Sequence, residues 1–124
     1  MAAVDILIAE DDPVLRQVYL KKFGIAGHTV RIAQNGQEAV AAIREKSPDI
    51  LILDFQMPLM DGFQVLETFP KEQRGFPVLA LTNFGDEHAR QRGDALGVDA
   101  YFVKRDMTMK ELITKVEELL TKKT

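Results

Sequence analysis

Five short apolar runs separated by helical patterns constrain the fold of this sequence more than any other feature. All but one of the runs are continuously apolar, which is typical of strands buried on both faces in a parallel sheet. The second run alternates polar and apolar residues, so we expect this strand to lie nearer an edge of the sheet. The runs are Ile6–Ala9, Thr29–Ala33, Ile50–Leu53, Val78–Leu81 and Tyr101–Val103.

Helical patterns fill the segments between these runs. Asp12 followed by Pro13 predicts a helix start, because aspartate caps helix N-termini and proline is tolerated at the first helical position. We expect this helix to end near residues 24–27. The segment 86–96 has few apolar residues and contains a glycine, so we expect that helix to pack loosely. The other predicted helices follow Asn35, span roughly 62–69 and follow Thr108.

Alternating strands and helices predict the fold class. They indicate βαβ units with right-handed crossovers, and therefore an α/β, doubly wound five-stranded parallel sheet with helices on both faces. A chain of 124 residues has the usual size of one domain. No linker or low-complexity tract divides it, so we expect a single domain over residues 1–124.

Composition excludes several functions. The formal net charge of −3 provides no basic surface, so we expect no nucleic-acid binding by this chain alone. The absence of cysteine excludes disulfides, thiolate metal sites and cysteine nucleophiles. The first residues do not resemble a signal peptide, and no apolar stretch reaches bilayer-spanning length. We therefore expect a cytoplasmic protein that does not bind membranes.

The residues that follow the strands predict a site, because ligands of open α/β sheets bind beyond the carboxyl ends of the strands. Asp12 is explained as a helix cap, and His28, in the turn before the second strand, is expected to be solvated. Taken alone, Tyr101 would be interpreted as a half-buried aromatic residue of a strand. The residues that follow strands one, three, four and five are Glu10 and Asp11, then Asp54, then Thr82, and then Lys104.

Carboxylates that converge in this way need a positive charge. The repulsion among Glu10, Asp11 and Asp54 would be on the order of kcal/mol in a partly dry site. Lys104 supplies one positive charge, and oxygen ligands without histidine or cysteine suit a hard ion such as Mg²⁺. A carboxylate beside Mg²⁺, a lysine and a hydroxyl is an arrangement for phosphoryl transfer, with the carboxylate as nucleophile.

The same residues carry a resemblance to a known family. The motifs are Ile6-Leu7-Ile8-Ala9-Glu10-Asp11-Asp12, Leu53-Asp54-Phe55-Gln56-Met57-Pro58-Leu59-Met60-Asp61-Gly62, Leu81-Thr82 and Tyr101-Phe102-Val103-Lys104. In this order they resemble the receiver domain of response regulators in two-component signalling, including the single-domain chemotaxis regulators. The resemblance covers nearly the whole chain. It implies the flavodoxin-like strand order 2-1-3-4-5.

The resemblance also implies roles for individual residues. Asp54 would be the phosphoacceptor. Mg²⁺ (or Mn²⁺) would be held by Glu10, Asp11, Asp54 and the backbone carbonyl of Gln56. Lys104 would pair with the phosphoryl oxygens. Thr82 would hydrogen-bond the phosphoryl group and let Tyr101 turn inward, which changes the surface of the fourth helix, fifth strand and fifth helix.

The implied partners are a sensor histidine kinase or phosphotransfer protein and a downstream protein target. The kinase, the phosphotransfer protein or a small phosphodonor would supply the phosphoryl group. The chain would be a monomer or a phosphorylation-dependent dimer. It would not be an enzyme in the usual sense, because it would catalyse only its own Mg²⁺-dependent phosphorylation and dephosphorylation.

Three positions depart from the family pattern. Arg105 replaces the proline that usually follows the lysine, so we expect a trans peptide bond there. Gln56 and Phe84 stand two residues after Asp54 and Thr82, at positions that flank the phosphoryl group in the family. We expect these bulky side chains to restrict water and slow dephosphorylation.

Two other functions compete with this interpretation. A phosphohydrolase of the haloacid-dehalogenase type needs a second acid two residues after the nucleophile, where this chain has Gln56, and it also needs a cap-domain insertion that the sequence lacks. A receiver-like adaptor that binds partners without phosphorylation is the other alternative. The complete set of Glu10, Asp11, Asp54, Thr82 and Lys104 argues against it, whereas Arg105 keeps this alternative open.

Overall fold

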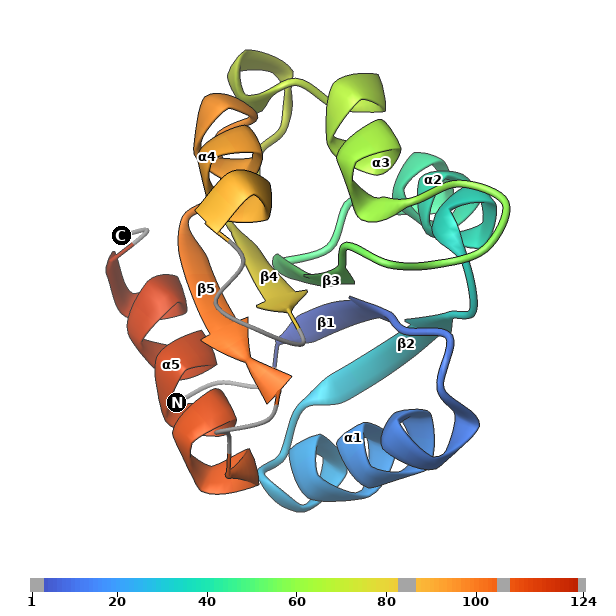
Figure 1. The fold of residues 1–124 in the computed structure, drawn as a ribbon. Helices are drawn as coiled ribbons and strands as arrows, with labels where there is room; N and C mark the ends of the chain where they lie inside the picture. Colours follow the sequence, from blue (N-terminus) through green and yellow to red (C-terminus); the bar gives the residue numbers. More distant parts are fainter. Residues whose placement is uncertain (1–3, 83–86, 105–107, 123–124) are drawn as a thin grey trace.

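The computed structural model describes residues 4–82, 87–104 and 108–122. Within these ranges, strands and α-helices alternate along the chain, five of each (Figure 1). The strands are β1 (Asp5–Ala9), β2 (Thr29–Ala33), β3 (Ile50–Asp54), β4 (Val78–Thr82) and β5 (Ala100–Val103). The helices are α1 (Pro13–Ile25), α2 (Gly36–Glu45), α3 (Gly62–Thr68), α4 (Glu87–Ala95) and α5 (Met109–Lys122). The predicted strands are confirmed, with ends that differ by at most one residue.

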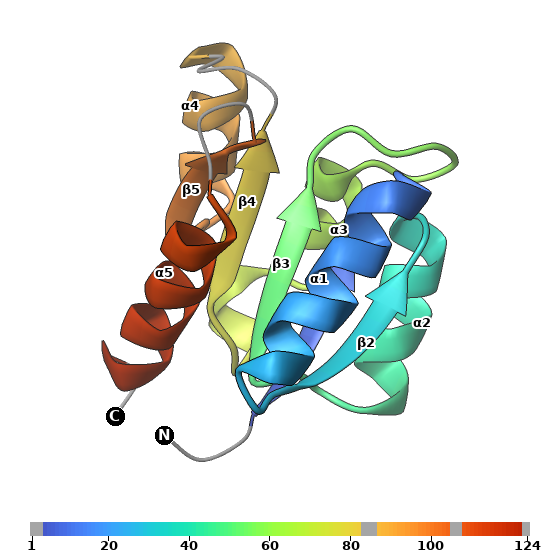
Figure 2. The same ribbon diagram turned by 90° about the horizontal axis from the view of Figure 1, so that it is seen from below.

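All strand pairs in the sheet are parallel, and the strand order is β2-β1-β3-β4-β5. This order confirms the predicted topology, and β2 lies at an edge, as its alternating pattern predicted. Figure 2 shows the arrowheads of β2, β3 and β4 pointing to the same end of the molecule. The loops that follow the strands therefore gather at one end, where the residues of the predicted site lie.

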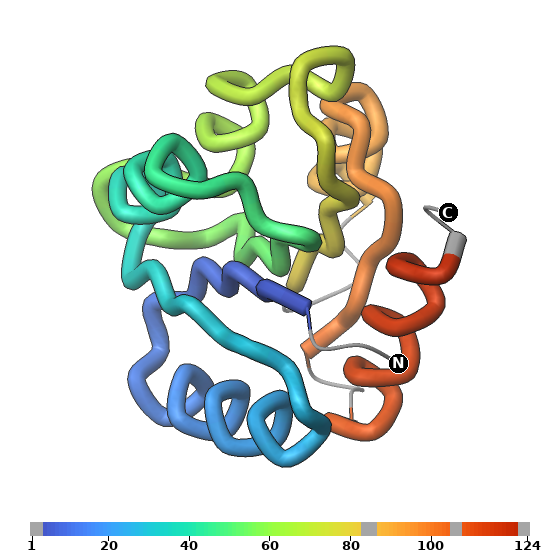
Figure 3. Tube along the Cα trace, turned by 180° about the vertical axis from the view of Figure 1, so that it is seen from behind, coloured from blue at the N-terminus to red at the C-terminus, as the bar shows by residue number. Residues whose placement is uncertain are grey.

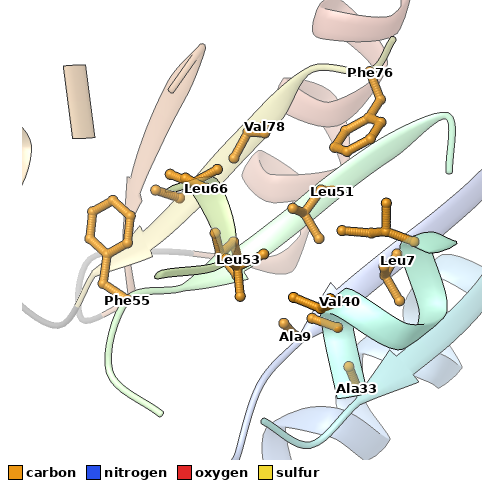
Figure 4. Close-up of a cluster of buried hydrophobic side chains, with 14 residues drawn as sticks. Leu7, Ala9, Ala33, Val40, Leu51, Leu53, Phe55, Leu66, Phe76 and Val78 are labelled. Carbon is orange, nitrogen blue, oxygen red and sulfur yellow. The ribbon is translucent and has the colours of Figure 1, made fainter. Parts of the chain in front are cut away.

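Helices cover both faces of the sheet, because successive residues of each strand point to opposite faces. Leu7, Leu51 and Leu53 belong to the core cluster that also contains buried residues of α2 and α3, with Ala89 of α4 packed against it (Figure 4). Ile6, Ile8 and their neighbours belong to the second cluster, with α1 and α5. Figure 3 shows α1 and α5 from behind, together on one face. Burial on both faces explains why the strands are continuously apolar.

The helix starts follow the predicted capping chemistry. The Asp12 side chain accepts hydrogen bonds from the backbone N–H groups of Val14 and Leu15 and so caps α1, as predicted. The Asn35 side chain caps α2 in the same way. The α3 start carries a capping box that the sequence analysis did not identify, formed by Asp61 and Gln64.

None of the described helices is both long and apolar enough to cross a bilayer.

The helix α4 packs weakly, as predicted, because Gly93 is the only buried residue among its nine residues. Its C-terminal end is held by Arg74, which precedes β4. The guanidinium group of Arg74 donates to the carbonyl oxygens of Leu96 (3.2 Å) and Gly97 (2.6 Å), and to that of Phe69 after α3 (3.0 Å). Arg74 therefore ties the C-terminal ends of α3 and α4 together.

The prediction that His28 is solvated is wrong. Its side chain is only 2% exposed, and its Nε2 lies 3.1 Å from Oε2 of Glu117 on α5. The α5 helix covers the turn between α1 and β2, where His28 lies. The two residues are 89 positions apart in the sequence, so no local pattern indicates their contact.

Candidate functional site

Buried carboxylates and a lysine meet at the C-terminal end of the sheet. Glu10 directly follows β1, Asp54 ends β3 and Lys104 directly follows β5. The Lys104 ammonium nitrogen lies 2.6 Å from Oε1 of Glu10 and 2.7 Å from Oδ2 of Asp54. Glu10 is fully buried and Asp54 is nearly so. Among the described residues, Lys104 is the cation whose side chain contacts both carboxylates.

Asp11 completes a group with the chemistry of a metal site. One carboxylate oxygen from each of Glu10, Asp11 and Asp54 lies within 4.8 Å of the other two. Asp11 is exposed, so the group is open to solvent on one side. The group contains neither histidine nor cysteine, and an all-oxygen donor set fits a hard divalent ion such as Mg²⁺, which keeps several waters. The structure thus brings together the acidic residues that the sequence placed at different strand ends.

Neighbouring groups orient the two buried carboxylates. The backbone N–H of Gln56 donates to Oδ1 of Asp54 at 3.0 Å, which leaves Oδ2 to Lys104. The hydroxyl of Tyr19 lies 3.5 Å from Oε1 of Glu10, and the backbone N–H of Asp12 lies 3.4 Å from Oε2. Gln56, whose carbonyl was predicted to bind the metal, therefore lies directly beside the predicted phosphoacceptor.

Burial and mutual repulsion change the proton affinity of the cluster. The pKa of Glu10 is raised from 4.5 to about 7, first by burial and then by the neighbouring Asp54, whereas Lys104 opposes the rise. Burial lowers the pKa of Lys104, but its contacts with Asp54 and Glu10 outweigh burial, so that the net shift of this pKa is upward. Lys104 is therefore charged at neutral pH, while Glu10 is partly protonated in the metal-free protein.

The raised pKa of Glu10 predicts how stability depends on pH. A folded-state pKa above the unfolded value adds stability that is complete below pH 4.5 and is lost as the pH rises through about 7. In EDTA, we expect the free energy of unfolding to fall by about 1 kcal/mol between about pH 6 and about pH 8. Urea denaturation measures this change. The Glu10→Gln variant should lose this part of the pH dependence, and an unchanged pH dependence in that variant would contradict the assignment.

Two residues of the site were missed by the sequence analysis. Arg16 on α1 donates from Nη1 to the carbonyl oxygens of Glu10 (3.2 Å) and Asp11 (2.8 Å), and so fixes the loop between β1 and α1. Tyr19 is 2% exposed with its hydroxyl toward Glu10, and burial together with that carboxylate raises the pKa of Tyr19. Asp12 and Pro13 predicted the helix that carries both residues, but not which face of this helix meets the acidic loop.

A glycine at the start of α3 permits close packing behind the predicted phosphoacceptor. A Cβ atom at Gly62 would lie 2.7 Å from the carbonyl oxygen of Asp54 and 3.0 Å from Cα of Phe55. The backbone N–H of Gly62 also donates to the carbonyl oxygen of Phe55 at 3.2 Å. The Asp-Gly pair of the sequence motif thus has a physical cause: Asp61 caps α3, and Gly62 lets the helix approach the end of β3.

Thr82 and Tyr101 lie on β4 and β5. Thr82 ends β4 and follows Leu81, which pairs with Asp54 across the sheet. The Tyr101 hydroxyl is directed at α4, where it lies 2.9 Å from the carbonyl oxygen of Arg90 and 2.8 Å from Oδ1 of Asp94. The predictions for Phe84 and for the peptide bond at Arg105 fall outside the described residues.

Comparison with known proteins identifies the family of this chain. A family model described as the response regulator receiver domain matches residues 6–117. A probable transcriptional regulator, ycf27 of Pyropia yezoensis, is 33% identical over 93% of this chain and 46% of its own length. The probable transcriptional regulatory protein TcrX of Mycobacterium tuberculosis is 32% identical over 94% of this chain and 50% of its own length. The chain therefore spans about half the length of these curated relatives.

Solved structures show the same fold. The receiver domain of the Francisella response regulator 1452 has a TM-score of 0.88 at 28% identity and covers 98% of this chain and 99% of its own. The chemotaxis protein CheY4 of Vibrio cholerae has a TM-score of 0.86 at 28% identity, covering 95% of this chain and 99% of its own. The family match extends over the acidic loop, Asp54 and Lys104. The chain thus belongs to the response regulator receiver domain family.

Proposed function

We propose that this receiver domain is a phosphorylation-dependent switch whose phosphoacceptor is Asp54. The phosphoryl group would come from a sensor histidine kinase, a phosphotransfer protein or a small phosphodonor. One observation supports the proposal above the others: Lys104 contacts the buried carboxylates of Glu10 and Asp54, with Asp11 close enough to share a metal ion. This arrangement pairs a nucleophile with the charges that a transferring phosphoryl group needs.

The proposed reaction forms one bond and breaks one. A carboxylate oxygen of Asp54 attacks phosphorus, and the bond from phosphorus to the donor's imidazole nitrogen breaks as the imidazole leaves with the electron pair. Lys104 then pairs with the phosphoryl oxygens, and the Thr82 hydroxyl donates to one of them. A divalent ion, when bound by Glu10, Asp11, Asp54 and the Gln56 carbonyl, supplies positive charge that offsets charge on the transferring group. Hydrolysis reverses the modification when water attacks phosphorus and the Asp54 carboxylate leaves.

The lifetime of the phosphoryl group provides a test of the flanking positions. Replacing Gln56 and Phe84 together with small polar residues should shorten the half-life of the phosphorylated protein, because water would reach phosphorus more easily. The half-life is measured by intact mass after the phosphodonor is removed. The control is Gln73→Ser, at an exposed position that precedes β4 at the opposite end of the sheet. An equal or longer half-life in the double variant would count against this role.

The proposed output is a change in the surface formed by α4, β5 and α5. A hollow in this surface is lined by residues of both helices and of β5, among them Arg90, Tyr101, Lys115 and Glu118. Phosphorylation would change this surface for a downstream protein target, with the chain acting as a monomer or as a phosphorylation-dependent dimer.

We propose that this chain acts in the cytoplasm and that it does not bind nucleic acid by itself. The curated relatives are named as transcriptional regulators, so control of transcription through a further domain or protein is one such output.

The rate of phosphorylation by acetyl phosphate tests the function. We expect one phosphoryl group per chain, a rate that rises with Mg²⁺ concentration, and no reaction in EDTA. The Asp11→Asn variant should need more Mg²⁺, whereas the Asp49→Asn variant, at the opposite end of the sheet, should behave as wild type. No modification under conditions that label another receiver domain would favour the phosphorylation-independent adaptor.

A further inference from the structure

The Tyr101 side chain is held against α4 by hydrogen bonds and by a cation–π contact. Its hydroxyl lies within hydrogen-bond distance of the Arg90 carbonyl (2.9 Å) and of the Asp94 carboxylate (2.8 Å). The guanidinium carbon of Arg90 lies 4.9 Å from the centre of the Tyr101 ring, in a cation–π arrangement. Of these partners, the Asp94 carboxylate is the acceptor that carries a charge, and hydrogen bonds to charged acceptors are the stronger ones.

Gly93 provides the space that Tyr101 occupies. A Cβ atom at this position would overlap the Tyr101 hydroxyl and would lie 3.0 Å from Cζ of Phe55. Glycine inside a helix weakens the helix relative to alanine. Gly93 therefore weakens α4 but leaves space for the Tyr101 hydroxyl, which we call the seat of Tyr101. The Asp94 carboxylate, which accepts from this hydroxyl, lies next to the seat.

The seat is connected to the carboxylate cluster through aromatic contacts. The Phe55 ring meets the Tyr101 ring edge to face, with centroids 6.4 Å apart, and it stacks on Phe63 of α3 at 4.3 Å. Phe55 directly follows Asp54 in the chain. A movement of the backbone at Asp54 therefore reaches Tyr101 through one side chain, and the contacts of Tyr101 with Arg90 and Asp94 carry it on to α4.

We propose that Asp94 is a positioning residue that couples Tyr101 to α4, so that a rotation of Tyr101 moves the helix. The inference rests on the proposed function, because it assumes that Tyr101 turns when Asp54 is phosphorylated. Without the carboxylate, Tyr101 would rotate in its seat while α4 stayed in place. The coupling would then be lost, although the reaction at Asp54 could proceed.

Fluorine NMR on protein labelled with 3-fluorotyrosine tests this coupling, because the chain has only two tyrosines. The Tyr101→Phe variant assigns the signal of Tyr101. The test variants are Asp94→Asn, which removes the charge but keeps the shape, and Gly93→Ala, which fills the seat. The control is Glu118→Gln, which removes a charge from the same hollow beside Tyr101. Spectra are recorded first without metal or phosphodonor, and then with both.

In the resting protein, Asp94→Asn and Gly93→Ala should each shift the Tyr101 signal, and Glu118→Gln should leave it unchanged. The populations of Tyr101 conformers should change about tenfold on loss of a charged hydrogen bond. Burial raises the pKa of Tyr101 and the Asp94 carboxylate raises it further, so Asp94→Asn should also lower the pKa of Tyr101 toward its ordinary value. A resting Tyr101 signal and pKa in Asp94→Asn equal to those of wild type would overturn the proposal.

The second set of spectra distinguishes a failure of the proposed Asp94 coupling from a failure of the proposed phosphorylation at Asp54. On phosphorylation of the wild type, the Tyr101 signal should shift and the hydrogen exchange of α4 amides should change. In Asp94→Asn the Tyr101 shift should remain while the change in α4 is lost, and a preserved α4 response would overturn the proposed coupling. A wild-type protein that takes no phosphoryl group refutes the proposed function, whereas the resting spectra still decide whether Asp94 holds Tyr101.

Discussion

Replacing Gly62 with alanine should lower the free energy of unfolding by about 2–3 kcal/mol, as overpacking of a buried site does. The added Cβ atom would lie 2.7 Å from the carbonyl oxygen of Asp54 and 3.0 Å from Cα of Phe55. These are backbone atoms of a central strand, which cannot move aside as the end of a flexible side chain can. Relief of the overlap must therefore displace α3 or the backbone that carries Asp54, so the rate of phosphorylation should fall as well.

The matched control for this change is Gly24→Ala near the end of α1. A Cβ atom there would meet no atom within 4 Å. Because alanine is the better helix former, this variant should be equal to wild type or more stable by about 0.5–1 kcal/mol. Urea denaturation measures both variants, and acetyl phosphate measures their reaction rates. Equal stabilities of the Gly62→Ala and Gly24→Ala proteins would contradict the close packing behind Asp54.

Replacing Lys104 with methionine should lower the free energy of unfolding of the metal-free protein by about 3 kcal/mol near pH 8, because it leaves two buried carboxylates without their cation. The side chains of Glu10 and Asp54 are 0% and 5% exposed, so water replaces little of the lost interaction. The loss should be smaller near pH 6, since protonation of Glu10 removes one of the charges. Added Mg²⁺ should restore more stability in the variant than in wild type.

Lys110→Met on α5 is the control, because Lys110 is exposed and substitutions at such positions usually change stability by less than about 0.5 kcal/mol. Urea denaturation in EDTA and in Mg²⁺ at both pH values completes the comparison. If the Lys104→Met and Lys110→Met proteins unfolded at the same urea concentration in EDTA, Lys104 would not stabilise the carboxylate cluster as described.

The sequence was sufficient to predict the strands, the helices and the end of the sheet where the carboxylates gather. The reason is physical: burial on both faces makes strands such as Ile50–Asp54 continuously apolar, and parallel strands bring their carboxyl ends to one edge. Capping at Asp12 is equally local, because the side chain bonds backbone groups two and three residues away. Features fixed by near neighbours in the chain were therefore predictable.

The features that were missed depend on how distant elements meet. The burial of His28 follows from α5 crossing the turn before β2, and the role of Tyr19 follows from the rotation of α1 about its axis. In the sequence, Gly93 was only a reason to expect that α4 packs loosely. In the structure, it also leaves space for the Tyr101 hydroxyl. Periodicity predicts which face of a helix is buried, but not which side chain of another element lies beneath it.

The most direct test of the central claim is the intact mass of the protein after incubation with acetyl phosphate and Mg²⁺, compared with that of the Asp54→Asn variant. Asparagine keeps the shape of the side chain but removes the nucleophilic carboxylate. We predict one added phosphoryl group on the wild-type chain, none on Asp54→Asn, and none on either protein in EDTA. Addition of a phosphoryl group to Asp54→Asn at the wild-type rate, or its absence from the wild-type protein, would contradict the account.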